Sequence, residues 1–359
     1  MATIWYSLYM NYIGSKKSLL KFIRENIAKH VETPGIFCDA FTGTGAVAAD
    51  FKAYSWQVIA GDIQEYSVVR LQHLLLNNEE PSFKKLLSED FPDAETPGER
   101  VLLYLDRLPG MKGFVYNNYS SGGTAGEEYV RNYFTDSNAM RCDAIRECIE
   151  TWDLAGLLSE GERAYLLASL LESVDQRANT ASVYGAFLKS TKASAAKDLE
   201  LKPLSIIPGN KKNVVEKRDA NDLVASTSGD VLYLDPPYNR RQYASNYHLL
   251  ETIALNDSPM IKGKTGLRDW KQQKSPWCSH KTVLPAFEEI IEKADYSLIA
   301  LSYNDEGIMS LEEVEKIMKA HGKYTLYTKK YSRFRADRAE ARNHKKDFVY
   351  EYLHVLEKD

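Results

Sequence analysis

The residues with the clearest chemical meaning are Asp235-Pro236-Pro237-Tyr238, which follow the apolar run 231–234. The run predicts a buried strand, so the tetrapeptide stands at the carboxyl end of a strand, where open α/β sheets bind their ligands. Two consecutive prolines make the turn stiff and fix the directions of its carbonyl oxygens. A carboxylate and a carbonyl can each accept a hydrogen from an aromatic amine, which exposes the nitrogen lone pair, while Tyr238 offers a ring for stacking. The motif therefore predicts a site that activates a planar amine.

A glycine-rich loop at Phe41–Ala46 follows a second short apolar run, 36–38, and Asp62 follows the next one, 56–60. Glycines let the backbone approach a ligand closely, and a carboxylate after the next strand can accept hydrogen bonds from ribose hydroxyls. The loop also satisfies the dinucleotide fingerprint, so by itself it leaves a nicotinamide and an adenosyl ligand open. The Asp-Pro-Pro-Tyr turn favours the adenosyl ligand.

Together, the glycine loop and the Asp235–Tyr238 turn resemble the motif pair of the D12 class of N6-adenine DNA methyltransferases, the α-group or Dam-like enzymes that use S-adenosylmethionine. The segment Asn11–Lys16 is similar to their N-terminal cofactor segment, and the motif order is also theirs. Residues 239–243 and 246–252 resemble the FokI-type modification methyltransferases, as do 263–266 and 302–304. The resemblance extends from Tyr12 to about Leu356.

The resemblance implies a cofactor site and a catalytic turn. Tyr12 and Lys16 would contact the methionine or adenosine part of the cofactor, Asp62 the ribose and Asp219 the adenine. Tyr12 replaces a common tryptophan and Ser15 a glycine, so a ring and a small residue remain. The implied cofactor-binding set is Tyr12, Gly14, Ser15, Lys16, Asp39, Phe41, Gly43, Gly45, Asp62, Ile63, Asp219, Ala220 and Asp235. The implied catalytic set is Asp235, Pro236, Pro237 and Tyr238.

The implied reaction is methyl transfer to N6 of an adenine flipped out of double-stranded DNA, without a covalent enzyme intermediate. Between residues 329 and 346, eight basic residues stand against two acidic ones, with two aromatic rings among them, which suits phosphates and bases. The candidate DNA-binding residues are Arg240, Arg241, Asn246, Tyr247, Lys330, Arg333 and Arg335. FokI-type enzymes can carry two fused catalytic units and this chain has one. It is therefore expected to methylate one strand of an asymmetric site or to rely on a second methyltransferase, and a cognate restriction endonuclease is a candidate partner.

The elements around these motifs predict an α/β fold, a doubly wound Rossmann-like methyltransferase domain with a mostly helical insertion. Strands are expected at 36–38, 56–60, 231–234, 298–301 and 348–355, and helices at 19–31, 283–294 and 310–321. A capping box at Ser159–Glu162 begins another helix. The catalytic domain is expected to comprise 1–80 and 209–359, and the helical insertion, the expected target recognition region, 81–208.

The amino-acid composition limits the classes of protein to which the chain can belong. The chain has 359 residues, 27% of them charged and 44% hydrophobic, which excludes a disordered or fibrous protein. A formal net charge of −4 leaves room for a local basic face. The four cysteines form no Cys-x-x-Cys pair and the histidines have no metal spacing, so we expect no metal site. No membrane segment or secretion signal is apparent, and we expect a cytoplasmic protein of bacterial or phage origin, associated with the nucleoid through DNA.

Three alternatives remain at this stage, and a nucleotide triphosphatase is disfavoured. The same fold could methylate an amine of RNA or of a glutamine side chain, or the chain could be a DNA-binding subunit without turnover. A nicotinamide oxidoreductase would use the same glycine loop. Gly263-Lys264-Thr265 resembles the end of a phosphate loop, but Ser258 stands where its first glycine should be.

Overall fold

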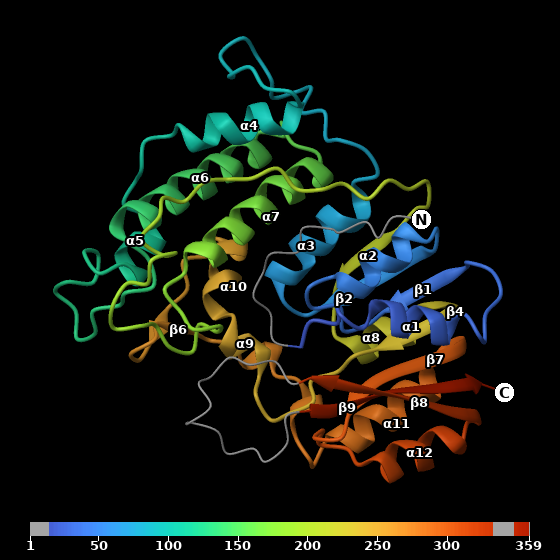
Figure 1. The fold of residues 1–359 in the computed structure, drawn as a ribbon. Coiled ribbons are helices and arrows are strands. Elements are labelled where there is room, and N and C mark those ends of the chain that lie inside the picture. The colour runs from blue at the N-terminus through green and yellow to red at the C-terminus, as the bar shows by residue number, and fades with distance from the viewer. Residues whose placement is uncertain (1–13, 333–347, 359) are drawn as a thin grey trace. The chain divides into compact units, whose positions relative to one another are not determined.

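The computed structural model describes residues 14–332 and 348–358, and these form two compact units (Figure 1). We call them the sheet unit, which is built from Gly14–Ile63, Gly209–Gln242 and the described part of Gln273–Asp359, and the helical unit, which is built from Gln64–Pro208 and Tyr243–Gln272. The chain therefore passes between the units several times, and each unit is assembled from separate segments.

The sheet unit is organised around a seven-stranded sheet of order β3-β2-β1-β4-β7-β9-β8. Its strands are β1 (Ile36–Asp39), β2 (Gln57–Asp62), β3 (Val214–Lys217), β4 (Ser228–Leu234), β7 (Asp295–Asn304), β8 (Gly322–Ser332) and β9 (Phe348–Lys358). Strands β3, β2, β1, β4 and β7 are parallel, whereas β9 is antiparallel to both β7 and β8. The strand order reverses between β1 and β4, which is the switch point where doubly wound sheets bind ligands.

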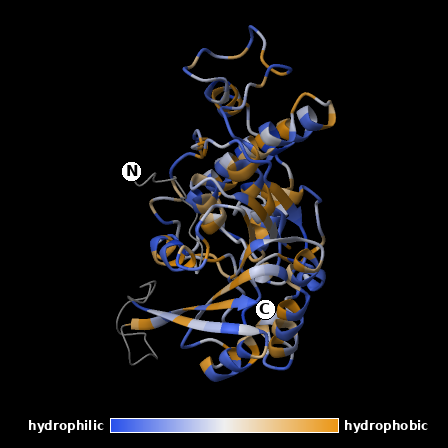
Figure 2. Ribbon diagram, turned by 90° about the vertical axis from the view of Figure 1, so that its right-hand side faces the viewer, coloured by the Kyte–Doolittle hydropathy of each residue, from blue (hydrophilic) through white to orange (hydrophobic). Residues whose placement is uncertain are grey.

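Helices cover both faces of this sheet. They are α1 (Leu20–Ile27), α2 (Ala46–Ala53), α8 (Ala220–Ala225), α11 (Val283–Lys293) and α12 (Leu311–Lys319), with the 3₁₀ turn η2 (Pro276–Cys278). On one face, α8, α11 and α12 bury residues such as Phe287, Ile290 and Val314 against the strands. On the other, Phe51 of α2 stacks on Phe37 of β1 with centroids 3.6 Å apart. Figure 2 shows hydrophobic and hydrophilic colours together on the helices, as amphipathic helices require.

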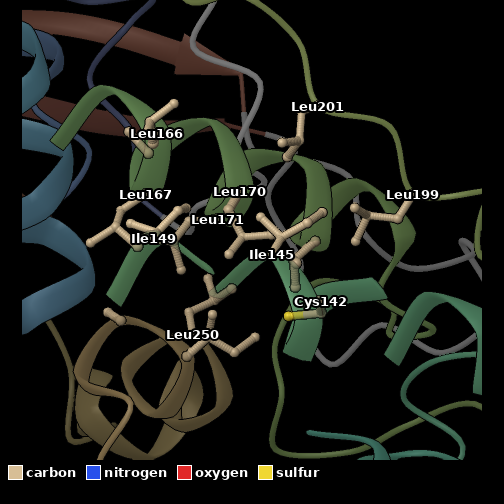
Figure 3. Close-up of a cluster of buried hydrophobic side chains, with 14 of the residues drawn as sticks. Cys142, Ile145, Ile149, Leu166, Leu167, Leu170, Leu171, Leu199, Leu201 and Leu250 are labelled. Carbon is tan, nitrogen blue, oxygen red and sulfur yellow. The ribbon is translucent and has the colours of Figure 1, made fainter. Parts of the chain in front are cut away.

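The helical unit has its own core. It contains α3 (Glu65–Leu76), α4 (Pro97–Asp106), α5 (Phe114–Tyr119), α6 (Asp136–Leu154), α7 (Glu160–Arg177), α9 (Tyr243–Asn246), α10 (His248–Leu255) and the hairpin β5 (Ile261–Lys262) and β6 (Leu267–Arg268), after which η1 (Lys271–Gln273) leads out of the unit. Apolar residues of α6, α7 and α10, among them Ile145, Leu170 and Leu250, pack together (Figure 3). Capping boxes begin α4 at Thr96 and α7 at Ser159, where the neighbouring glutamates complete the motif.

The expected Rossmann-like α/β fold is confirmed, and each expected strand is present. Among the strands, β3, β8 and the β5–β6 hairpin were missed. By compactness, residues 64–80 and 243–272 pack with the helical unit, whereas the sequence-based division placed them with the sheet. The reason is visible in α3 and α10, whose apolar residues Val69 and Leu250 join the helical core.

Candidate active site

Lys16 and Asp235 form an ion pair at the switch point of the sheet unit. Asp235 directly follows β4, and the Lys16 Nζ lies 3.0 Å from its Oδ1, with side-chain exposures of 6% and 17%. The same ammonium group donates a hydrogen bond to the carbonyl oxygen of Gly14 and lies 4.7 Å from the centre of the Tyr238 ring. The structure therefore brings together the N-terminal segment and the Asp235–Tyr238 turn, which are more than half of the chain apart in sequence.

Carboxyl groups converge at this edge of the sheet. Burial raises the pKa of Asp235, while Lys16 acts in the opposite direction. Burial also raises the pKa of Asp39, at the end of β1, well above its usual value, and the charges of Asp235 and Asp62 add to this rise. An environment that favours protonated carboxyl groups also favours a bound cation or hydrogen-bond donors, because either relieves the same repulsion.

The glycine loop between β1 and α2 has the geometry of a ligand cradle. Gly43 and Gly45 have φ angles of 53° and 78°, which L-residues adopt only with strain. The Asp62 Oδ2 accepts a hydrogen bond of 2.9 Å from the Gly43 N–H, so the carboxylate after β2 also fixes the loop. The Asp39 Oδ1 is buried and has no hydrogen-bond partner within the described chain. An unsatisfied buried acceptor beside a glycine loop fits a ligand that carries hydrogen-bond donors, as an adenosyl group does.

A second aromatic wall stands next to the glycine loop. The Phe41 ring meets the ring of Trp277 edge to face, with centroids 5.0 Å apart. The Trp277 Nε1 donates a hydrogen bond to Asn221 in α8. Asp219 is the N-cap of α8, where its carboxylate accepts the N–H of Asn221 at 2.9 Å, and Ala220 is buried beside it. Asp219 therefore stands at the carboxyl edge of the sheet, and its carboxylate holds the start of a helix.

The Asp235–Tyr238 turn is held from the side of β7. The Tyr238 ring lies 4.8 Å from the ring of Tyr303, and the Ile308 N–H donates to the Tyr238 carbonyl oxygen. Pro236 is buried and Pro237 half-buried. Burial raises the pKa of the Tyr238 hydroxyl well above its usual value, and the charges of Asp235 and Glu351 add to this rise.

The remaining predicted cofactor residues are distributed as follows. Gly14 has a φ of 85° and is exposed, and Ser15 is half-buried. The Ile63 carbonyl oxygen accepts a hydrogen bond from the Gln273 side chain, which ties the end of β2 to the segment before η2. Tyr12 lies outside the described residues.

The predicted DNA-binding residues that the structure describes belong to both units. Arg240 and Arg241 are exposed in the loop after the Asp235–Tyr238 turn, and Lys330 is exposed on β8 with its Nζ 3.8 Å from the centre of the Phe348 ring. Asn246 and Tyr247 belong to the helical unit, and Tyr247 is fully buried. Its ring packs near those of Tyr66, Tyr184 and Tyr243, so its observed role is in the core. Arg333 and Arg335 lie outside the described residues.

Sequence reasoning missed three residues that the structure places near the predicted site: Trp277, Tyr303 and Glu351. Trp277 carries no local signal, since an isolated aromatic residue is more often part of a core. Tyr303 lies in the 302–304 segment of the family resemblance but was given no role in the site. Glu351 does carry a local signal, because it lies on the same buried side of β9 as the alternating apolar residues Val349 and Leu353. A carboxylate in an apolar row of a strand can be read from sequence alone.

Comparisons with known proteins agree with this geometry. Residues 12–317 match the model of the D12 class of N6 adenine-specific DNA methyltransferases. The chain is 46% identical to the type II methyltransferase M.NlaIII of Neisseria lactamica, over 97% of this chain and 99% of that protein. It is 39% identical to the type II methyltransferase M.FokI of Planomicrobium okeanokoites, over 98% of this chain but 53% of that protein. It is also 32% identical to the type II methyltransferase M.CviAII of Paramecium bursaria Chlorella virus 1, over 95% and 97%.

A doubly wound sheet with an Asp-Pro-Pro-Tyr turn at its switch point defines a Rossmann-like methyltransferase. The chain belongs to the D12 class of N6 adenine-specific DNA methyltransferases, and it is an adenine-specific DNA methyltransferase. In the part of the chain that the structure describes, no group of three or more His, Cys, Asp and Glu side chains could hold a metal ion. In the same part, every helix is too short or too polar to cross a membrane.

Proposed function

We propose that the sheet unit binds S-adenosylmethionine at the carboxyl ends of β1, β2 and β4, and that the Asp235–Tyr238 turn receives an adenine flipped out of double-stranded DNA. The observation that carries the proposal is the cluster of Lys16, Asp235 and Tyr238 at the switch point. When bound, the cofactor supplies an activated methyl group on a positively charged sulfur. Every other contribution comes from the side chains and backbone of this chain.

Each part of the cluster has a definite task in this proposal. Asp235 and a carbonyl oxygen of the proline turn accept the two N6 hydrogens, which makes the nitrogen lone pair available. Tyr238 stacks on the base, and Tyr303 holds its ring in place. Lys16 keeps the Asp235 carboxylate oriented through the 3.0 Å contact. The amine proton that is released leaves to Asp235 or to water.

The glycine loop and its neighbours would hold the cofactor. Asp39 has an unsatisfied buried oxygen available for a donor of the ligand, and Asp62 shapes the loop. Phe41 and Trp277 supply apolar surface for the adenosyl group. Asp219 stands at the end of β3, where the adenine part would lie.

The helical unit is proposed as the target recognition region. It has a separate core, so its surface can vary without disturbing the sheet. Like its type II relatives, the enzyme would be the modification component of a restriction-modification system, and a cognate endonuclease would be its partner. Because its substrate is bacterial or phage DNA, we place the enzyme in the cytoplasm.

The test is methylation-aware sequencing of DNA from cells that express the wild-type protein or Asp235→Ala. We expect N6-methyladenine at one short motif with the wild type and none with the variant, while the affinity for duplex DNA is retained. Asp295→Ala is the matched control, because Asp295 is exposed at the amino end of β7, the opposite edge of the same sheet. Equal methylation by Asp235→Ala would refute the assigned role, and modified RNA or protein without modified DNA would identify a different substrate.

A further inference from the structure

Glu351 occupies an unusual place in the sheet unit. It lies near the start of β9, where it is in register with Asn304 of β7 and with Lys329 of β8. Asn304 is the last residue of β7, and β7 is parallel to β4. Because β9 runs antiparallel to β7, Glu351 lies at the carboxyl edge of the sheet, where Asp235 and Tyr238 also stand.

The Glu351 carboxylate is buried without full compensation. Its side chain is 8% exposed, and its Oε2 has no hydrogen-bond partner in the described chain. Its neighbours in the same phase of the strand, Val349, Leu353 and Val355, are apolar and buried. A buried carboxylate with an unsatisfied oxygen destabilises a fold, so its presence at a ligand edge points to a functional role.

Charged groups from several elements surround Glu351. Its pKa is raised to about 7, chiefly by burial; the charges of Asp235 and Asp305 also raise it, while Lys16 and the Tyr238 hydroxyl act in the opposite direction. On β4, the charge of Glu351 contributes to the raised pKa of the Tyr233 hydroxyl. From β8, Lys329 is its register partner. Glu351 therefore belongs to the same electrostatic cluster as Lys16 and Asp235.

This inference rests on the proposed function. We propose that Glu351 is the residue by which the site selects the positively charged S-adenosylmethionine over S-adenosylhomocysteine, the product in which the sulfur is uncharged. Lys16 and Asp235 neutralise each other, so an ionised Glu351 adds an unpaired negative charge beside them. That charge attracts a sulfonium group and gives no such advantage to a thioether, which favours substrate binding before transfer and product release after it.

The proposal has a thermodynamic consequence that binding experiments can measure. A bound cation stabilises the ionised carboxylate and so lowers the Glu351 pKa, and by linkage an ionised carboxylate strengthens the binding of the cation. Near neutral pH, binding of S-adenosylmethionine therefore releases protons, and binding of S-adenosylhomocysteine releases fewer. A shift of about one pKa unit raises the preference for S-adenosylmethionine about tenfold over the whole titration, and about fivefold between about pH 6 and about pH 8.

The experiment is titration calorimetry of the full-length protein with each ligand, in buffers of different ionisation enthalpy across that pH range. Glu351→Gln keeps the shape of the side chain and removes the charge. We expect this variant to lose both the extra proton release and the pH dependence of the preference. Glu357→Gln is the matched control, because it makes the same substitution on the same strand at a half-exposed residue that pairs with Lys323 and His30. It should behave as the wild type does.

The outcomes separate the two proposals. If both ligands bind to the wild type with equal proton release and a constant preference, the role of Glu351 is refuted while the proposed cofactor site stands. A Glu351→Gln variant that folds and keeps the wild-type pH dependence refutes it too. If neither ligand binds to the wild type, the proposed function itself fails. Should Glu351→Gln not fold, the wild-type comparison between the two ligands still decides.

Discussion

Replacement of Lys16 by methionine would test the electrostatic design of the site most directly. The Lys16 side chain is 6% exposed and its partner Asp235 is 17% exposed, so both charges are largely removed from water. Loss of one partner of a buried pair costs about 3–5 kcal/mol, and we expect about 3 kcal/mol here because Asp235 keeps some contact with solvent. For a unit of this size, that corresponds to a decrease of roughly 6–12 °C in the unfolding midpoint.

The effect of Lys16→Met should depend on pH with a definite sign. Burial already raises the folded-state pKa of Asp235, and the loss of the neighbouring cation raises it further. When the pKa of a carboxyl group is higher in the folded protein than in the unfolded protein, the folded state binds more protons. The free energy of unfolding therefore falls as the pH rises through the interval between the two pKa values. The destabilisation should therefore be largest above this interval and should diminish as the pH falls through it.

A double-mutant cycle supplies the control. Lys16→Met together with Asp235→Asn removes both charges, and we expect it to recover at least half of the stability that Lys16→Met alone loses, as measured by urea denaturation followed by circular dichroism. Neither variant should methylate DNA at the wild-type rate. The electrostatic reasoning is refuted if Lys16→Met lies within about 0.5 kcal/mol of the wild type above pH 7, or if the double variant is as unstable as the single one.

Two further predictions concern DNA binding and acid stability. The affinity for duplex DNA should fall steeply as the salt concentration rises. Arg241→Ala should reduce the slope of log affinity against log salt by about one, whereas the control Lys316→Ala on α12 should leave it unchanged. Fluorescence anisotropy measures these slopes, and equal slopes for Arg241→Ala and the wild type would show that Arg241 does not contact a phosphate. Burial lowers the pKa of His354 to about 4, so the folded state binds fewer protons than the unfolded state and stability should fall as the pH decreases from about 6.5 towards 4. Chemical denaturation of the wild type and His354→Gln at several pH values checks this, and an unchanged pH dependence in the variant would contradict it.

Much of the fold could be predicted because its strands and motifs have strong local signals. The apolar runs that become β1 and β4 are each followed by turn residues with a definite chemistry, so their place at the ligand edge followed from sequence. Strand β8 was missed because its residues, Gly322–Ser332, alternate polar and aromatic side chains that are mostly half-exposed and give no clear apolar phase. Its partner β9 was found because its buried positions are apolar.

The site could be predicted only in part. The ion pair of Lys16 with Asp235 joins two motifs, but no rule of spacing gives a contact between residues so distant in sequence. Tyr247 shows the opposite error, since its place beside a motif suggested DNA contact and its side chain is in the core of the helical unit. The roles assigned to the remaining residues stay predictions until ligand binding is measured.

The switch point also has a consequence for how the protein acquires its structure. Strands β1 and β4 pair side by side, yet residues 40–227, including most of the helical unit, separate them along the chain. Closing so long a loop is slow when its residues are unstructured, and a helical unit that folds early would shorten it. The edge of the sheet at which the Asp235–Tyr238 turn and the glycine loop lie is then among the last parts to be completed. Activity would accordingly appear only in molecules that have finished folding, and a partly folded chain would remain without effect on DNA.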